Sequence, residues 1–196
     1  MQKNISLFII LLSSLVTVGC VQVIPEHSAN QFAISSVRDL PVSYPKGSIF
    51  LLSPKYVKET SLKPEQTQAV YNLYNDAIVN NLIENGYVKG QERQQAAFYV
   101  GFGIAFSSDL SDEKISDEFG VTPGLPGKAA LKKGSFLLYI EDAATGQRVW
   151  RGIVQGFADT NLTPMQRHQR AATVVENVMK QFYVKRYVVD RCTSYT

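Results

Sequence analysis

The sequence contains few of the residues on which most catalytic and metal sites depend. Its 196 residues include only two cysteines and two histidines, His27 and His168. It has no Gly-x-Ser-x-Gly nucleophile motif, no His-Glu-x-x-His zinc motif and no Walker phosphate-binding loop. His168 has no Cys, His or carboxylate partner four residues away, so we expect it at the surface and not as a metal ligand. We therefore predict a protein that is not an enzyme, with no catalytic, cofactor-binding or metal-binding residues.

The sequence also has no large excess of either positive or negative residues. Twenty Lys and Arg residues face seventeen Asp and Glu residues, and the formal net charge is +3. Nucleic-acid binding depends on clustered cations that displace counterions from phosphates, whereas the cations of this chain are dispersed. The composition therefore excludes a nucleic-acid-binding protein. The hydrophobic content of 45% is ordinary for a globular domain with its own core.

The N-terminal hydrophobic run is too short to cross a bilayer comfortably as a helix. Ile5 to Val18 is a run of 14 residues without charge, whereas a membrane span takes about 20 residues. Lys3 precedes the run, and this layout is typical of a secretory signal peptide. Gly19-Cys20 closes it and resembles the lipobox of bacterial lipoproteins, although Thr17 stands where that motif usually has Leu. The alternatives are an ordinary signal with a chance cysteine, or an uncleaved anchor.

Lipidation of Cys20 is what the lipobox resemblance implies, on the sulfur and on the new amino group after cleavage. Acyl chains such as palmitate would anchor the protein firmly, because each buried CH₂ contributes about 0.8 kcal/mol. Val21 follows the cysteine, and by resemblance to Gram-negative lipoproteins this predicts the outer membrane, with the protein facing the periplasm. Cys192 is then the only free thiol, so no intrachain disulfide is available. It is either an unimportant thiol near the terminus or a site of intermolecular bridging.

The prolines and the hydrophobic pattern divide the chain into four segments. We predict a lipoprotein signal peptide over 1–19, a lipidated Cys and flexible tether over 20–34, a single α+β periplasmic domain over 35–190, and a frayed tail over 191–196. Phe32 to Leu40 is a candidate edge strand, and Lys185 to Val189 is a candidate last strand.

The stretch from Gly134 to Gly156 predicts a β-hairpin that includes its turn. Phe136, Leu138 and Ile140 recur at the period of two that is typical of a half-buried strand. Asp142 to Gly146 supplies the turn, with an Asp that can bond to nearby backbone and a Gly that accepts positive φ. On the return strand, strict alternation places Val149, Arg151 and Ile153 on one face and Trp150, Gly152 and Val154 on the other. We expect Trp150 to pack under a helix and Arg151 to lie on the opposite side.

Two strands flanking a helix are predicted upstream of the hairpin. Ser48–Ser53 is a short apolar strand, and the helix begins at Pro64 and ends at Asn85-Gly86, with Tyr71 facing water. Ala96–Ser107 alternates bulky and small residues, so one face must be core and the other must allow close approach by a helix, a strand or another subunit. The two strands should be parallel, because a helical crossover joins them.

The remaining segments are a loop and a second helix. Residues 108–133 carry an acidic cluster, then two Pro-Gly pairs and three lysines. The cluster lacks the Asp-x-Asp-x-Asp-Gly spacing of a calcium loop, so we predict an irregular segment that is either mobile or partner-binding, with a metal site the least favoured alternative. Thr163 begins a helix with Pro164 at its first position and a capping-box Gln166, and its apolar stripe runs to Phe182. The fold expected is α+β, with two helices packed on one face of a mixed, mainly antiparallel sheet of four to five strands, in the order β-α-β-β-β-α.

The chain resembles the domain-of-unknown-function 4136 family of Gram-negative bacterial lipoproteins over roughly Ser48 to Phe182. The resemblance is carried by the helix ending at Gly86-Tyr87, by the terminal helix, and by a hairpin pattern consisting of Gly134, Asp142, Thr145, Val149, Trp150, Arg151 and Gly152. It implies a small periplasmic α+β domain anchored by lipid, with no assigned catalytic residues. At the level of fold alone, the family is similar to modules of envelope export lipoproteins that assemble into rings.

Two functions remain open at this stage. The first is a lipid-anchored envelope protein of structural or assembly type, which contacts envelope protein partners or further copies of itself. The alternative is a periplasmic module that binds a small apolar or glycan ligand, which a pocket lined by aromatic residues would favour.

Overall fold

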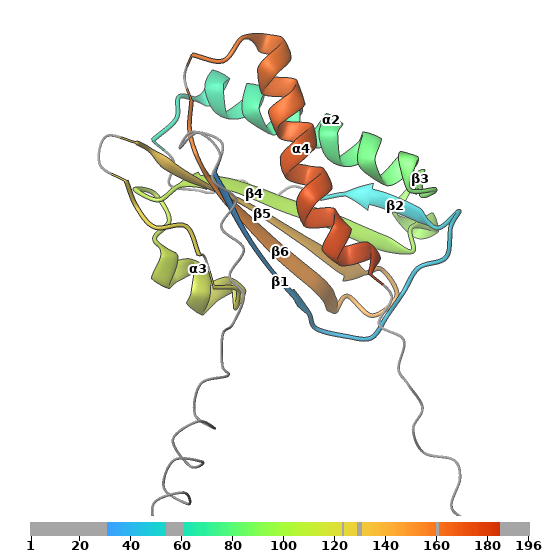
Figure 1. Cartoon of the computed structure of the whole chain (residues 1–196). Helices are drawn as coiled ribbons and strands as arrows, with labels where there is room; N and C mark the ends of the chain where they lie inside the picture. The colour runs from blue at the N-terminus through green and yellow to red at the C-terminus, as the bar shows by residue number, and fades with distance from the viewer. Residues whose placement is uncertain (1–30, 54–60, 123, 129–130, 160, 185–196) are drawn as a thin grey trace, which may run out of the picture.

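The computed structural model describes residues 31–53, 61–122, 124–128, 131–159 and 161–184, which form a six-stranded mixed sheet with helices on both faces (Figure 1). The strand order is β1-β6-β5-β4-β2-β3; β2 is parallel to β3 and β4, and all other pairs are antiparallel. The strands are β1 Phe32–Arg38, β2 Ile49–Leu52, β3 Val88–Lys89, β4 Phe98–Phe106, β5 Lys133–Asp142 and β6 Arg148–Phe157. The helices are α2 Pro64–Glu84, α3 Asp112–Phe119 and α4 Pro164–Tyr183, with a short 3₁₀ turn, η2, over Arg93–Gln95.

The predicted α+β class and the parallel pairing of the strands that flank α2 are confirmed. The count of four to five strands was too low, because the short edge strand β3 adds to β2; the edge strand predicted over Phe32 to Leu40 is β1, which pairs with β6. β1 begins at Phe32, within the segment predicted as tether. The predicted strand over 185–189, the tail over 191–196, Cys20 and Cys192 lie outside the described residues.

The hairpin is formed by β5 and β6, and its turn has the predicted chemistry. The Asp142 carboxylate accepts hydrogen bonds from the backbone N–H and the hydroxyl of Thr145, both at 2.9 Å, and Gly146 has a φ of 69°. The alternation predicted for β6 is wrong at its start. A β-bulge lets Ile140 pair with Trp150 and Glu141 pair with Arg148, so Val149 is the extra residue and joins Trp150 in the core under the helices.

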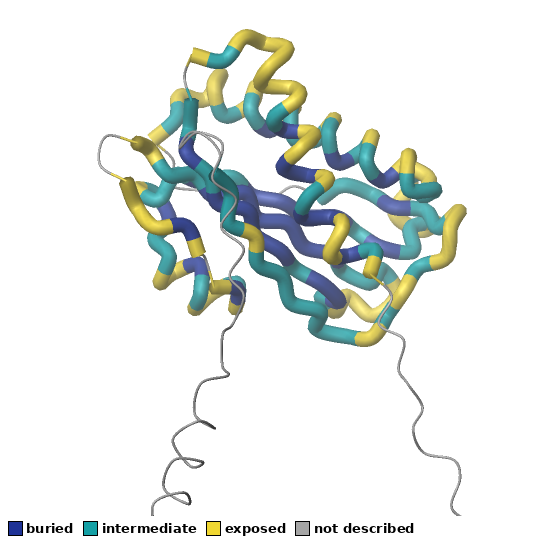
Figure 2. Tube along the Cα trace, viewed as in Figure 1, coloured by how far each residue is buried: buried dark blue, intermediate teal, exposed yellow. Residues whose placement is uncertain are grey.

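Helices α2 and α4 cover one face of the sheet and enclose the main core between them and β2, β4, β5 and β6 (Figure 2). Trp150 is 1% exposed and meets Phe182 of α4 edge-to-face at 5.7 Å, as expected for a side chain under a helix. Gly152 lets α4 approach β6, because a Cβ there would lie 2.6 Å from Val178. The caps of both helices follow the prediction: Pro64 and Pro164 are first-turn residues, and Thr163 and Gln166 form a capping box.

Tyr71 is buried, which corrects the prediction that it faces water. Only 4% of the residue is exposed, and its hydroxyl accepts a hydrogen bond from the Ile104 backbone N–H at 3.2 Å. Its ring packs on Phe102 at 5.4 Å. The face of α2 that packs on the sheet therefore includes Tyr71 with Ile78 and Leu82. A tyrosine can be buried in this way when its hydroxyl has a hydrogen-bond partner.

The opposite face of the sheet is partly covered by α3, in the segment predicted to be irregular. Ser111 caps α3 by accepting a hydrogen bond from Lys114 N–H at 3.3 Å, and Ile115 is fully buried in a second, smaller core with Leu137 and Ile153. Buried Gln155 of β6 joins α3 to the sheet, because its side-chain amide donates to an Asp112 carboxylate oxygen at 2.8 Å. The acidic cluster thus contributes a structural hydrogen bond.

Candidate functional site

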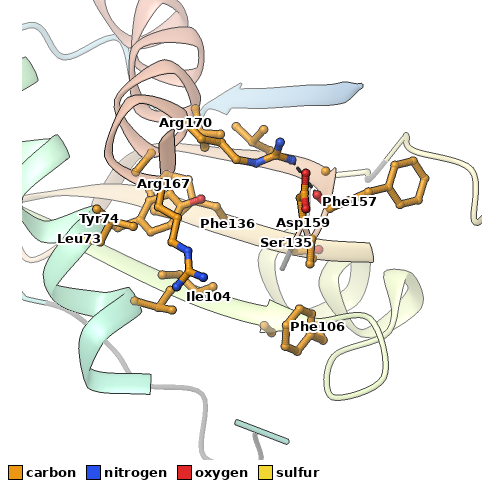
Figure 3. A pocket seen from close by; sticks show the side chains of 18 of the residues that line it. Leu73, Tyr74, Ile104, Phe106, Ser135, Phe136, Phe157, Asp159, Arg167 and Arg170 are labelled. Atoms are coloured by element: carbon orange, nitrogen blue, oxygen red, sulfur yellow. Dashed lines mark hydrogen bonds between the residues drawn. The ribbon is translucent and has the colours of Figure 1, made fainter. Parts of the chain in front are cut away.

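A pocket of about 590 Å³ lies between the helix layer and one end of the sheet (Figure 3). Its floor consists of the last residues of β4 and β6 and the first residues of β5, which antiparallel pairing brings side by side. Its walls are the N-terminal halves of α2 and α4, and Phe32 at the start of β1 borders it on the side of β6. The pocket is therefore built by six elements of one folded unit.

A pair of glycines explains why the floor is hollow. Gly134 of β5 and Gly156 of β6 are partners in the sheet register. They lie two residues from Phe136 and Val154, which belong to the core under the helices, so they face the same side of the sheet. A Cβ on Gly134 would have no atom closer than 3.7 Å, whereas one on Gly156 would lie 2.9 Å from the ring of Phe32. The floor is therefore open over Gly134, whereas the absence of a side chain at Gly156 makes room for the Phe32 ring.

Aromatic rings form much of the pocket wall. Tyr74 of α2 stacks on Phe136 of β5 with the ring centroids 4.6 Å apart, and Phe32 and Phe106 also line the pocket, whereas the Phe157 ring points away from it (Figure 3). Burial raises the pKa of Tyr74 to about 12, although the nearby charge of Arg170 acts in the opposite direction. The Tyr74 hydroxyl is therefore neutral at pH 7. A wall of this kind favours the binding of flat or flexible apolar groups, and the Tyr74 hydroxyl offers a hydrogen-bonding group beside them.

Among the described residues that line the pocket, the charged ones are two arginines of α4 and one carboxylate: Arg167, Arg170 and Asp159. Arg170 donates a hydrogen bond from Nη2 to the Phe157 carbonyl at 2.7 Å, and its guanidinium lies 4.9 Å from the centre of the Phe32 ring. Arg167 donates from Nε to the Leu162 carbonyl at 3.0 Å. In Figure 3 the side chains of Arg170 and Asp159 point toward one another. The lining therefore carries one more positive than negative side chain.

The structure places the histidine and the Trp-Arg pair considered in the sequence analysis far from a shared site. His168 is exposed, with Nδ1 2.9 Å from the Pro164 carbonyl oxygen, as predicted for a surface histidine. Trp150 and Arg151 lie on opposite faces of the sheet, as expected, and Arg151 pairs with Asp39 at 3.1 Å. In the described ranges no three or more His, Cys, Asp or Glu residues form a group that could hold a metal ion. The described lining of the pocket offers apolar and charged groups that could bind a ligand.

The carboxylates predicted as a loop cluster are dispersed. Asp109 accepts hydrogen bonds from the backbone N–H and the hydroxyl of Ser61, at 3.0 and 3.1 Å. Asp112 forms an ion pair with Lys133. Burial alone would raise the pKa of Asp112, but hydrogen bonds from Lys133 and Gln155, together with the charge of Lys133, hold it below the usual range. These contacts fasten α2 and α3 to the sheet, and they do not gather oxygens around one point.

The pocket itself was missed by sequence reasoning. From the sequence, Gly134 and Gly156 are placed only at the ends of the hairpin, and the apolar stripe of the terminal helix does not single out Arg167 or Arg170. The available signal was the pair of glycines at equivalent ends of two predicted partner strands, where core positions are expected to carry bulky residues. Cys20 lies outside the described residues. Along the part of the chain that the structure does describe, no helix combines the length and hydrophobicity of a membrane span.

A family model described as Domain of unknown function (DUF4136) matches residues 50–182. No curated protein matches the chain. Among solved structures, a DUF4136 family protein from Bacteroides thetaiotaomicron is 14% identical, with a TM-score of 0.45 over 77% of this chain and 95% of that one. The PelC dodecamer of Paraburkholderia phytofirmans is 10% identical, with a TM-score of 0.45 over 76% and 95%. A lipoprotein from Neisseria meningitidis is 11% identical, with a TM-score of 0.37 over 68% and 99%.

Proposed function

The chain belongs to the family described as domain of unknown function (DUF4136), and from this premise we propose that it is a lipid-anchored, non-catalytic envelope protein whose folded domain binds a small ligand. The observation that carries the binding function is the aromatic pocket between α2, α4 and the end of the sheet. Its volume of about 590 Å³ falls within the range of about 300–1,000 Å³ that is usual for small-molecule sites. Of the two functions that the sequence left open, the pocket favours the ligand-binding module.

The anchoring half of the proposal is supported by the lipobox-like sequence that ends at Cys20. Palmitate labelling in Gram-negative cells, followed by fractionation of the two membranes, tests it directly. We expect the label and the protein in the outer-membrane fraction for the parent chain and for the Cys192→Ala control, and loss of both for Cys20→Ala. A Cys20→Ala protein that is still labelled and membrane-bound would contradict the anchor.

The binding half is tested with a neutral apolar probe, N-phenyl-1-naphthylamine, whose fluorescence rises in apolar surroundings. The protein used is the mature chain, residues 20–196, with Cys20→Ser so that neither acyl chain nor detergent competes; all described residues lie within it. We expect saturable binding that Gly134→Leu abolishes, because the new side chain would occupy the hollow floor. Gly127→Leu is the matched control, since a Cβ at Gly127 meets nothing within 4 Å and the residue is exposed outside the pocket. Equal binding by all three proteins would refute a ligand-binding role for this pocket.

A second function, assembly through protein contacts, is favoured by the long edge strand β1. In the described sheet β1 pairs only with β6, and Ile34 on this strand is 41% exposed. An open edge of seven residues is a template for pairing with a strand of another chain. Light scattering on the mature chain is expected to show an oligomer that Ile34→Lys dissociates. A monomeric parent protein at all accessible concentrations would contradict self-assembly through this edge.

A further inference from the structure

We propose that the pocket selects small amphipathic anions, which place an apolar body over Gly134 and an acidic group at Arg170 and Arg167. This inference rests on the proposed binding function and adds the chemical class of the ligand. A carboxylate or phosphate at the end of an acyl or aromatic body has the chemistry required.

The charges of the lining favour an anion over a cation or a neutral polar group. In the part of the lining that the structure describes, Arg167 and Arg170 outnumber Asp159, and the other residues are uncharged. Both arginines lie in the N-terminal half of α4, and the N-terminal half of α2 forms the facing wall. Arg167 follows the first three residues of α4, so the positive end of this helix dipole adds to its charge. An anion that leaves water for this site therefore gains electrostatic attraction that a cation would lack.

Arg170 is held in place before any ligand arrives. Its hydrogen bond to the Phe157 carbonyl at 2.7 Å and its position 4.9 Å from the centre of the Phe32 ring both restrict the guanidinium. A guanidinium has five N–H donors in a rigid plane that suits carboxylate and phosphate oxygens. Because little side-chain freedom remains to be lost on binding, each new hydrogen bond to Arg170 contributes more to affinity.

The apolar part of the ligand has a defined place. The stacked rings of Tyr74 and Phe136 form the wall beside the glycine floor, and their centroids are 4.6 Å apart. A body without polar groups would cover this surface and would remove it from water. A bare inorganic anion would leave the same surface exposed, so we expect it to bind poorly. The ligand must therefore combine both parts.

The test compares two probes that share one aromatic body, namely neutral N-phenyl-1-naphthylamine and anionic 1-anilinonaphthalene-8-sulfonate. On the mature chain with Cys20→Ser, Arg170→Gln and Arg167→Gln should each weaken binding of the sulfonate about tenfold, which corresponds to about 1.4 kcal/mol. Binding of the neutral probe should change less than twofold. Arg170→Lys should recover part of the loss, and Lys180→Gln, which removes a charge from an exposed position of the same helix, should change neither affinity.

Displacement of the bound sulfonate then defines the ligand. Decanoate should displace the sulfonate probe if the pocket accepts an acyl chain, and 1-naphthoate should displace it if the pocket accepts an aromatic body. Inorganic phosphate at equal concentration should not displace the probe. Displacement by phosphate alone, or by none of the three, would overturn the inference. So would equal losses for both probes in the two arginine variants, or no loss for either. These outcomes differ from failure of the proposed function itself, in which Gly134→Leu would leave binding of both probes intact.

Discussion

Filling the pocket should make the protein more stable while it abolishes binding. Gly134→Leu is the perturbation, because the backbone at Gly134 does not have a positive φ and a Cβ there would meet no atom closer than 3.7 Å. The substitution therefore introduces no backbone strain and no unavoidable clash. Natural proteins are rarely at their stability optimum, and filling an empty space of this kind commonly stabilises the folded protein.

The magnitude follows from two contributions. Full burial of a leucine side chain is worth about 1.5–3 kcal/mol, and we take less than half of this because Arg167 at the pocket rim is exposed and the new side chain would be covered only in part. Replacing a glycine whose backbone conformation suits other residues adds about 0.4–1 kcal/mol through the unfolded state. We expect a gain of about 1–2 kcal/mol in the free energy of unfolding, or about 3–6 °C in Tm for a domain of this size.

Thermal and urea unfolding of the mature chain, followed by circular dichroism, measure this gain. Gly134→Ala separates the backbone contribution from the burial of the longer side chain, and Gly127→Leu reports the effect of an exposed leucine. We expect stability to rise from Gly134→Ala to Gly134→Leu. A Gly134→Leu protein that is less stable than Gly134→Ala would refute the claim that this position faces open, apolar space.

Three further predictions concern the fold that holds the pocket. Gly152→Ala should destabilise by about 1–3 kcal/mol in urea unfolding, because its Cβ would lie 2.6 Å from Val178, whereas Gly127→Ala should cost nothing. Asp112→Asn should lower the free energy of unfolding at pH 7 and make this free energy less dependent on pH in the acid range. The pKa of Asp112 is depressed in the folded protein, so the ionised carboxylate contributes to stability above the ordinary value of 3.8, and this contribution is lost as the pH falls below that value. Thr163→Ala, which removes the cap of α4, should cost about 1 kcal/mol in the same assay. Unchanged unfolding curves would contradict the first and third predictions, and an identical pH dependence in the acid range the second.

The elements predicted correctly are those whose signals are local. The turn after Asp142 and the cap at Thr163 are decided by residues three apart, so the sequence alone places them. Helix α3 was missed although Ser111 and Gly120 flank it, because Ile115 is its one buried residue and a single apolar position shows no period. The bulge at Val149 also leaves no local signal, since it depends on how β6 pairs with β5.

The pocket depends on contacts between distant segments. Gly134 and Gly156 are 22 residues apart in the sequence, and only the sheet register makes them neighbours. Arg170 enters the site because α4 packs over the strand end that carries Phe157. From the helical pattern alone, such an arginine is predicted to face solvent. Periodicity shows which side of a helix is apolar, but it does not show which other element packs beside the polar residues.

A crystal structure of the mature chain with 1-anilinonaphthalene-8-sulfonate bound would test the central claim most directly. We predict that the ring system lies over Gly134, beside Tyr74, with the sulfonate oxygens within hydrogen-bonding distance of Arg170. A probe bound at another surface, with this pocket empty at saturating concentration, would contradict the account.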